Sequence, residues 1–267
     1  MDMQSLRVIG ARVKRMAGSL LPMPAPVKFV IVTRGRTGSN LLVSLLNSHP
    51  RIRIYGEVVG EAMMRTPSLK KELLRMGALS YVCRFFKRYG FESAAGVKFL
   101  YYQLESDYGQ RWHVTGLPDI FNYLTSQNNI KVIHVKRKNR LECLASIRVA
   151  AHTNTYTVSK EAKVKSQHNT IFLSPEECEQ EFELIGQWEA TYDEAFLHHE
   201  KLDVYYEELV DNMQVECDRV LKFLGVEKRN LFTSFKKQQS RPLSLVVSNF
   251  YELAEKFSGT KWSKYFE

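Results

Sequence analysis

The sequence predicts an α/β protein in which helices cover both faces of a parallel β-sheet. Short apolar segments with the composition of buried strands alternate with helical patterns, and this alternation favours a parallel sheet. The first segment, FVIV, is too apolar to be exposed on either side, as is typical of a central strand. The predicted strands span residues 29–33, 97–101, 131–135 and 202–206. Long helices are predicted over residues 176–200, with Pro175 at the start, and over 211–226, with Gly225 as the cap.

The turn RGRTGSN follows the first predicted strand and has the composition of an anion-binding site. Gly35 and Gly38 permit a backbone that approaches a ligand closely. Ser39 or Asn40 is expected to cap the following helix, whose N-terminus presents free N–H groups and a positive dipole end. Arg36 adds a permanent charge. An ordinary turn without a ligand is the alternative, and the two arginines in this turn make it less favoured.

The turn resembles a P-loop, but its sequence differs from that of the loop that binds nucleoside triphosphates. The pattern G-x-x-x-x-G-K-[ST] requires a lysine before the serine or threonine, and here no lysine stands there. The strand at 131–135 runs into the basic stretch KRKNR, where such an enzyme would place a metal-binding carboxylate. We therefore expect an anion that is neutralised by arginine and lysine without a metal ion. A P-loop kinase with a degenerate loop is the alternative, and it predicts magnesium dependence.

Three parts of the chain resemble the sulfotransferases that use 3′-phosphoadenosine 5′-phosphosulfate (PAPS). RTGSNLLVSLLNSHP is similar to the family's 5′-phosphosulfate loop, and KVIHVKRKNRLECLASIR is similar to its 3′-phosphate segment. LDVYYEELVDN and KQQSRPLSLVVSNFYEL resemble the C-terminal part of the domain. The likeness is closer to the bacterial, carbohydrate-directed branch, with its trehalose and nodulation-factor sulfotransferases. The cytosolic phenol and steroid enzymes carry lysine where Arg36 stands here.

The resemblance implies a fold, a donor and a role for each matching residue. The residues implied to cradle the 5′-phosphosulfate are Arg36, Thr37, Gly38, Ser39 and Asn40. Arg137 and Ser146 would hold the 3′-phosphate of PAPS, which leaves as adenosine 3′,5′-bisphosphate. Lys237 or Arg241 of the stretch KKQQSRP could close over the nucleotide, and an exposed basic loop is the equal alternative.

Sulfuryl transfer to a hydroxyl needs positive charge at the leaving oxygen and a base for the acceptor's proton. Arg36 suits the first role. Glu57 and Glu61 of YGEVVGE are the candidates for the second. Glu57 ranks first because the resemblance implies a glutamate at or near this position, and Glu61 ranks second because a related enzyme has its base a few positions later. One short loop, NSHPRIRIYG, is expected to return Glu57 towards the sulfur. The histidines are weaker candidates, and His134, inside an apolar strand, is expected to be a core or strand-end residue.

The amino-acid composition limits which binding partners and which cellular compartment are expected. The 267 residues suffice for one large domain, and the net charge of +9 suits an anionic ligand. Aromatic residues are not interleaved with basic ones, so nucleic acid is not an expected partner. The 4 cysteines form no C-x-x-C pair, which fits a reducing cytoplasm. The expected acceptor is a small molecule or glycan, and the sequence identifies neither it nor the oligomeric state.

The stretch LPMPAP at residues 21–26 predicts a stiff linker, because each proline fixes its own φ. It divides the chain into a basic N-terminal segment, residues 1–26, and one sulfotransferase domain, residues 27–267. Residues 4–21 could form a basic amphipathic helix. Packing of this helix on the domain is the favoured interpretation, and contact with an anionic membrane surface is the minor one.

Overall fold

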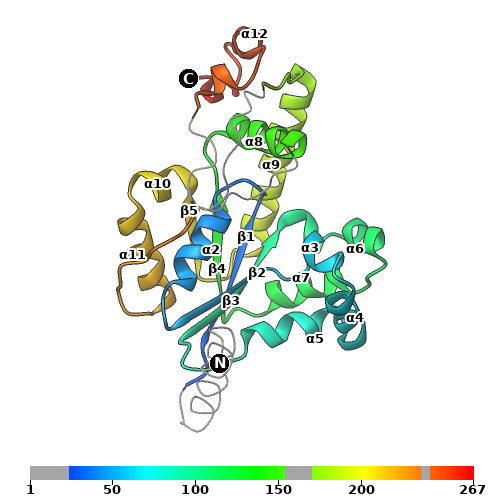
Figure 1. Ribbon diagram of the computed structural model, residues 1–267, viewed down its shortest axis with the longest axis vertical. Coiled ribbons are helices and arrows are strands. Elements are labelled where there is room, and N and C mark those ends of the chain that lie inside the picture. The colour runs from blue at the N-terminus through cyan, green and yellow to red at the C-terminus, as the bar shows by residue number, and fades with distance from the viewer. Residues whose placement is uncertain (1–23, 154–169, 236–240) are drawn as a thin grey trace, which may run out of the picture.

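A computed structural model describes residues 24–153, 170–235 and 241–267 (Figure 1). At its centre lies a parallel sheet of five strands in the order β2-β3-β1-β4-β5. The strands are β1 (Val27–Thr33), β2 (Ile52–Glu57), β3 (Ala94–Leu100), β4 (Ile130–Lys136) and β5 (Lys201–Tyr205). The carboxyl ends of all five therefore meet at one edge. The predicted parallel α/β class is confirmed.

The edge strand β2 corrects the prediction of a short loop after the first helix. Residues 52–57 pair with β3, beginning with Ile52 opposite Ala94. Ile52 and Ile54 are buried while Arg53 between them is exposed, which is the alternation of an edge strand. The register shifts before Glu57, which comes to lie opposite Lys98 of β3. The chain thus returns to the carboxyl edge of the sheet as a hydrogen-bonded strand.

Alternate residues of β1 enter separate cores on the two faces of the sheet. Val30 and Val32 pack in the cluster that contains α5 (Ala78–Cys83) and α7 (Leu117–Ser126). Phe29 and Ile31 pack in the cluster that contains α2 (Ser39–Asn47) and α11 (Met213–Leu224). Burial on both faces explains why FVIV contains no polar residue.

The remaining helices extend these two layers and cover the carboxyl edge (Figure 1). The helices α3 (Glu61–Met64), α4 (Pro67–Met76) and α6 (Ser106–Trp112) lie on the side of α5 and α7, and α10 (Tyr206–Asp211) lies beside α11. At the carboxyl edge, α8 (Arg140–Thr153), α9 (Pro175–Ala195) and α12 (Phe250–Lys256) share a third apolar cluster. The 3₁₀ turns are η1 (Arg84–Phe86), η2 (Tyr101–Leu104), η3 (Leu243–Leu245) and η4 (Ser263–Tyr265).

Both predicted long helices are present. α9 begins at Pro175, and the Ser174 side chain accepts a hydrogen bond from the Glu177 N–H at 3.1 Å. It ends at Ala195 rather than at residue 200, because the chain turns there into β5. The C-cap of α11 is Gly225 with φ 68°, so the predicted left-handed cap is confirmed. Among the described residues, no helix combines the length and apolarity that crossing a membrane requires. Residues 4–21 lie outside the described residues.

Candidate active site

The turn between β1 and α2 has an unusual backbone. Arg36 and Gly38 both take left-handed conformations, with φ 73° and φ 76°. For arginine this region is sparsely populated, and such strain is concentrated at functional sites. A Cβ added to Gly38 would lie 2.2 Å from Cδ2 of Tyr206, at the start of α10. Glycine is therefore required at this position by the ring packed against it as well as by its φ.

The predicted cap of α2 is wrong. Gly38 is the N-cap, no side chain caps the helix, and Ser39 and Asn40 are its first two residues. The left-handed Gly38 places Ser39 one position too late to act as the cap. Among the described residues, the N-cap therefore offers no side chain to the N–H groups of the first turn, and such groups favour an anion. Thr37 turns inward, with its hydroxyl 2.9 Å from Arg34 O and hydrogen-bonded to Thr33.

Three residues that were predicted to bind the two phosphate ends of the donor lie together. Arg36 Nε donates to Ser146 Oγ of α8 at 2.9 Å. Arg137, which follows β4, donates from Nη1 to Arg36 O at 3.0 Å. The Arg137 guanidinium also lies 4.5 Å from the centroid of the Tyr206 ring. The loop after β1, the end of β4 and helix α8 thus form one basic site.

Arg137 has an unsatisfied donor in this site. Its side chain is 12% exposed and Nη2 forms an ion pair with Glu142. Its buried Nε has no hydrogen-bond partner among the described residues. A buried N–H without a partner is costly and rare in folded proteins. Lys138, by contrast, points away to Glu208, with Nζ 2.7 Å from the carboxylate. The open donor of Arg137 therefore fits an anionic ligand.

A lysine reaches the loop from a neighbouring strand. Lys98 of β3 is 1% exposed, and its Nζ donates to Asn40 Oδ1 at 2.5 Å and to Glu57 Oε1 at 2.8 Å. An ammonium group thus lies at the start of α2, although the loop itself contains no lysine. The other Glu57 oxygen, Oε2, accepts from Gln103 Nε2 at 2.9 Å. The predicted base therefore shares a cluster with the phosphate-loop helix.

The sequence patterns assign no site role to Lys98 or Gln103. The sequence did contain one indication for Lys98. It lies within an otherwise apolar strand, and a lysine is almost never buried in such a place without a partner. All seven residues of β3 are buried, Lys98 included. Gln103 carries no such signal, since a glutamine after a strand is ordinary.

Two other predicted site residues are not brought to the loop by a contact among the described residues. The Glu61 side chain at the start of α3 is 41% exposed and lies 3.5 Å from both Arg65 and Arg111. Arg241 donates to Leu245 O at 2.5 Å. Lys237 lies outside the described residues.

A groove begins at Asn40 and follows the exposed side of α2. Its volume is about 650 Å³. The segment 232–235 forms one wall and is fastened to the helix by hydrogen bonds from Thr233 to Ser44 Oγ, at 2.9 Å, and from the Phe232 N–H to Ser48 Oγ, at 3.1 Å. The lining residues are Asn40, Val43, Ser44, Asn47, Ser48, Phe232, Thr233, Ser234 and Phe235. Aromatic rings beside amides and hydroxyls suit a flat, uncharged heterocycle.

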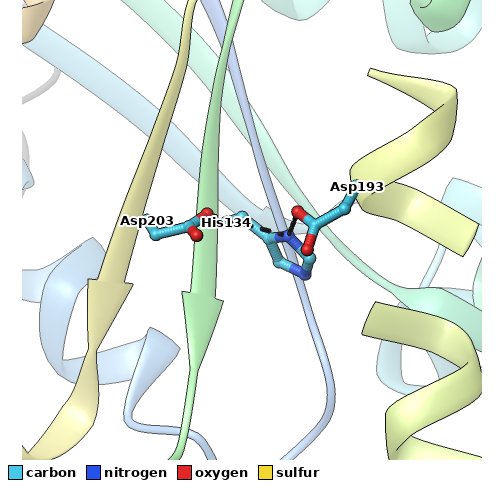
Figure 2. A group of neighbouring side chains, drawn as sticks. All are labelled: His134, Asp193 and Asp203. Atoms are coloured by element: carbon cyan, nitrogen blue, oxygen red, sulfur yellow. Dashed lines mark hydrogen bonds and ion pairs between the residues drawn. The ribbon is translucent and has the colours of Figure 1, made fainter. Parts of the chain in front are cut away.

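A second polar cluster joins β4, β5 and α9 and contains His134, Asp193 and Asp203 (Figure 2). His134 is fully buried, which confirms its prediction as a core residue. Its Nδ1 lies 3.0 Å from Asp193 Oδ1 and its Nε2 lies 2.5 Å from Tyr101 OH. Burial and, after it, the charge of Lys136 lower the pKa of His134 to about 4, and Asp193 opposes both. The ring is therefore neutral at physiological pH.

Lysines neutralise the two aspartates of this cluster. Lys136 Nζ donates to Asp193 at 2.8 Å and to Asp203 at 3.1 Å, and Lys201 Nζ donates to Asp193 at 2.5 Å. Burial opposes ionisation of Asp193, but these bonds and His134 hold its pKa well below the usual value. An ammonium group already bridges the carboxylates that a metal ion would need. The cluster therefore acts as an ionic cross-link beneath the end of β4.

Comparison with known proteins agrees with this geometry. The model of a protein family described as "Sulfotransferase family" matches residues 28–230. Nodulation protein H of Rhizobium tropici is 26% identical over 268 residues, which cover 92% of this chain and 95% of the relative. Nodulation protein H of Rhizobium meliloti (strain 1021) is 29% identical over 259 residues, covering 94% and 98%.

A solved structure shares the fold. The crystal structure of a sulfotransferase from Alicyclobacillus acidocaldarius aligns with a TM-score of 0.52 and 16% identity, covering 88% of this chain and 92% of that one. The family model spans most of the chain, including the loop after β1, the strand β4 and helix α8. The chain therefore belongs to the sulfotransferase family and is a sulfotransferase.

Proposed function

We propose that this sulfotransferase moves a sulfuryl group from PAPS to a hydroxyl of a carbohydrate or glycolipid, without a metal ion. One observation carries the proposal: Arg137, beside Arg36 and Ser146, has a buried N–H that finds no partner in the described part of the chain. The donor bears phosphate groups on the 3′ and 5′ positions of one ribose, so the residues that bind them have to lie close together. The contacts of Arg36 with Ser146 and Arg137 meet this requirement.

We assign a binding group of the protein to each phosphate-bearing end of PAPS. Arg36 and the first N–H groups of α2 would bind the 5′-phosphosulfate, because both favour negative charge. Arg137 and Ser146 would bind the 3′-phosphate, which can replace Glu142 as the anionic partner of the guanidinium. The groove along α2 would take the adenine, since it opens from Asn40 at the phosphate loop and carries the rings of Phe232 and Phe235.

The reacting groups would gather where Lys98 joins Asn40 to Glu57. The donor supplies a sulfuryl group whose bond to the 5′-phosphate oxygen breaks as the acceptor oxygen attacks. Arg36 and Lys98 would stabilise the negative charge on the transferred group and on the leaving oxygen. Glu57 would accept the proton of the acceptor hydroxyl. Its side chain is 31% exposed, which leaves an approach for an acceptor.

Family membership favours sulfuryl transfer over the kinase alternative. The resemblance to carbohydrate-directed sulfotransferases supports a sugar hydroxyl as the acceptor. A cytoplasmic location, membrane contact through the basic N-terminus and a single domain over residues 27–267 remain predictions.

The direct test follows labelled sulfur from the donor. The purified protein is incubated in EDTA with PAPS labelled in its sulfuryl group and with neutral oligosaccharides, glycolipids and simple alcohols. We expect label on a saccharide or glycolipid, and loss of that label in the Arg36→Ala variant. Magnesium-dependent phosphoryl transfer from ATP without any sulfuryl transfer would contradict the proposal.

A further inference from the structure

We infer that Gln103 is a positioning residue that fixes Glu57 as a carboxylate aimed at the acceptor. The inference rests on the proposed function, in which Glu57 takes the acceptor's proton. Gln103 lies in η2, directly after β3, and is fully buried. A buried amide whose own orientation is fixed can also fix the orientation of the side chain to which it is hydrogen-bonded.

The backbone decides how the Gln103 amide points. Gln103 Oε1 lies 3.0 Å from the N–H of Leu100, the last residue of β3. A backbone N–H only donates, so the amide oxygen has to face it. The amide nitrogen Nε2 therefore faces Glu57 Oε2, at 2.9 Å. The contact with Glu57 is thus a donated hydrogen bond, and the strand end itself fixes its direction.

Both neighbours of the Glu57 carboxylate are donors. Gln103 donates to Oε2, and the ammonium of Lys98 donates to Oε1 at 2.8 Å. Glu57 accepts at both oxygens, which is the pattern of a carboxylate and not of a protonated acid. Each oxygen keeps a second lone pair, so Glu57 can still accept a proton from an acceptor. The two donors together prevent the side chain from rotating away.

The other titratable groups near Glu57 carry charges of both signs, because Arg34 lies close enough to Tyr102, and Arg111 close enough to Tyr108, to oppose a rise in the pKa of each phenol. Burial raises the pKa of Tyr102 in η2 and of Tyr108 in α6, and the charge of Glu57 contributes to both shifts. Both phenols are therefore neutral at physiological pH. Glu61 of α3 adds a negative charge nearby, since it also raises the pKa of both tyrosines. Among the described groups, Lys98 is thus the cation in direct contact with Glu57.

The 3₁₀ turn η2, which carries Gln103, is held in place by hydrogen bonds to other elements. Tyr101, the first residue of η2, is hydrogen-bonded through its hydroxyl to His134 at 2.5 Å. Its backbone oxygen accepts from the Tyr192 hydroxyl of α9 at 2.9 Å. The turn that carries Gln103 is therefore fixed to β4 and α9. A positioning residue needs such a support, because a mobile one would not hold the base in place.

The substitution Gln103→Glu tests the direction of this hydrogen bond. One new carboxylate oxygen can still accept from the Leu100 N–H. The other would face Glu57 Oε2, where two carboxylates in contact have to share a proton. The acidic limb of the pH profile of kcat should move to higher pH by at least about one unit. On the acidic limb, a shift of one unit should lower turnover about tenfold at a given pH, and turnover should recover in alkaline buffer.

Two further variants distinguish this effect from a general loss of folding or of donor binding. Gln110→Glu places the same charge on the exposed surface of α6, and its pH profile should match that of the wild type. Gln103→Met removes both hydrogen bonds but adds no charge, so kcat should fall, and the acidic limb should move to higher pH by less than in Gln103→Glu. The KM for PAPS and the melting temperature with adenosine 3′,5′-bisphosphate report whether each variant keeps its fold and donor site.

The outcomes distinguish this inference from the proposed function. An inactive Glu57→Gln variant beside a Gln103→Glu variant with the wild-type pH profile would overturn the inference and leave Glu57 as the base. A Glu57→Gln variant with normal turnover would overturn the assignment of the base itself. If Gln103→Glu does not fold, Gln103→Met decides: wild-type kcat in that variant would contradict a positioning role.

Discussion

Arg36 donates a hydrogen bond from Nε to Ser146 Oγ at 2.9 Å, across 110 positions of sequence. The contact joins the loop after β1 to helix α8. It therefore brings a residue proposed for the 5′ end of the donor against one proposed for the 3′ end. An arginine with φ 73° is held in this place by the surrounding chain rather than by its own backbone preference.

The two site arginines should differ in what they contribute. Arg36→Ala should lower both donor affinity and kcat, with kcat falling about 10²–10³-fold, because this guanidinium faces charge that grows in the transition state. Arg137→Ala should weaken donor binding roughly tenfold to a hundredfold and leave kcat nearly unchanged, because the 3′-phosphate does not react. Steady-state kinetics at saturating acceptor measure both effects. Equal losses of kcat at saturating donor would contradict this division of roles.

The groove along α2 should bind the adenine. Phe235→Ala should raise the KM for PAPS at least about fivefold, since stacking of a base on an aromatic ring is worth ~1–3 kcal/mol. The KM for the acceptor should stay the same. Phe172→Ala is the matched control, because Phe172 is 68% exposed and does not line the groove. If Phe235→Ala instead raised the KM for the acceptor alone, the groove would be an acceptor site.

His134 should make the protein acid-sensitive. Its pKa is about 4 in the folded protein against 6.5 for a free side chain. The unfolded state therefore binds a proton first as the pH falls through this window, so the free energy of unfolding should fall between about pH 6.5 and pH 4. This single group contributes at most about 3 kcal/mol. Urea titrations at several pH values measure the slope.

His134→Gln is the control for this slope. Glutamine can keep one donor for Asp193 and one acceptor for Tyr101 but does not titrate. The variant should show a smaller loss of stability over the same pH range, whatever its stability at pH 7. Asp193 does not affect the comparison above about pH 5, because its lowered pKa begins to reduce stability only below that pH. Equal slopes in both proteins would show that His134 is not held neutral.

Glu57→Gln should abolish most turnover and keep donor binding. Loss of a positioned base typically costs about 10²–10⁴-fold in rate. The affinity for adenosine 3′,5′-bisphosphate should change little, because Glu57 contacts Lys98 and Gln103 rather than the predicted phosphate site. Glu61→Gln is the control, since Glu61 pairs with Arg65 and Arg111 at the surface. Near-normal turnover in Glu57→Gln with a loss in Glu61→Gln would move the base to Glu61.

Elements with strong local patterns could be predicted from the sequence. FVIV predicted the central strand β1 because burial on both faces removes polar residues. β2 was not predicted, because its alternation covers only IRI before Tyr55 and Gly56. The missing cap of α2 was equally hidden, since a left-handed Gly38 shifts the helix start by one residue.

The site could be predicted only in part. The loop and the strand β4 were recognised as motifs, and the structure brings Arg36, Arg137 and Ser146 into one place. The contact of Lys98 with Glu57 depends on the pairing of β2 with β3, which is a long-range property of the sheet. Glu57 differs from Glu61 in its contacts with Lys98 and Gln103, and no local sequence pattern reports such long-range contacts. The assignment of these residues to the donor and the acceptor stays a prediction.

The most direct measurement compares two nucleotides by isothermal titration calorimetry in EDTA. Adenosine 3′,5′-bisphosphate carries both phosphate groups, whereas adenosine 5′-monophosphate lacks the one proposed to meet Arg137. We expect the bisphosphate to bind the wild type at least about tenfold more tightly, and Arg137→Ala to remove most of that difference. Equal affinity of the wild type for both nucleotides, or binding that requires magnesium, would contradict a donor held at both ends by arginine.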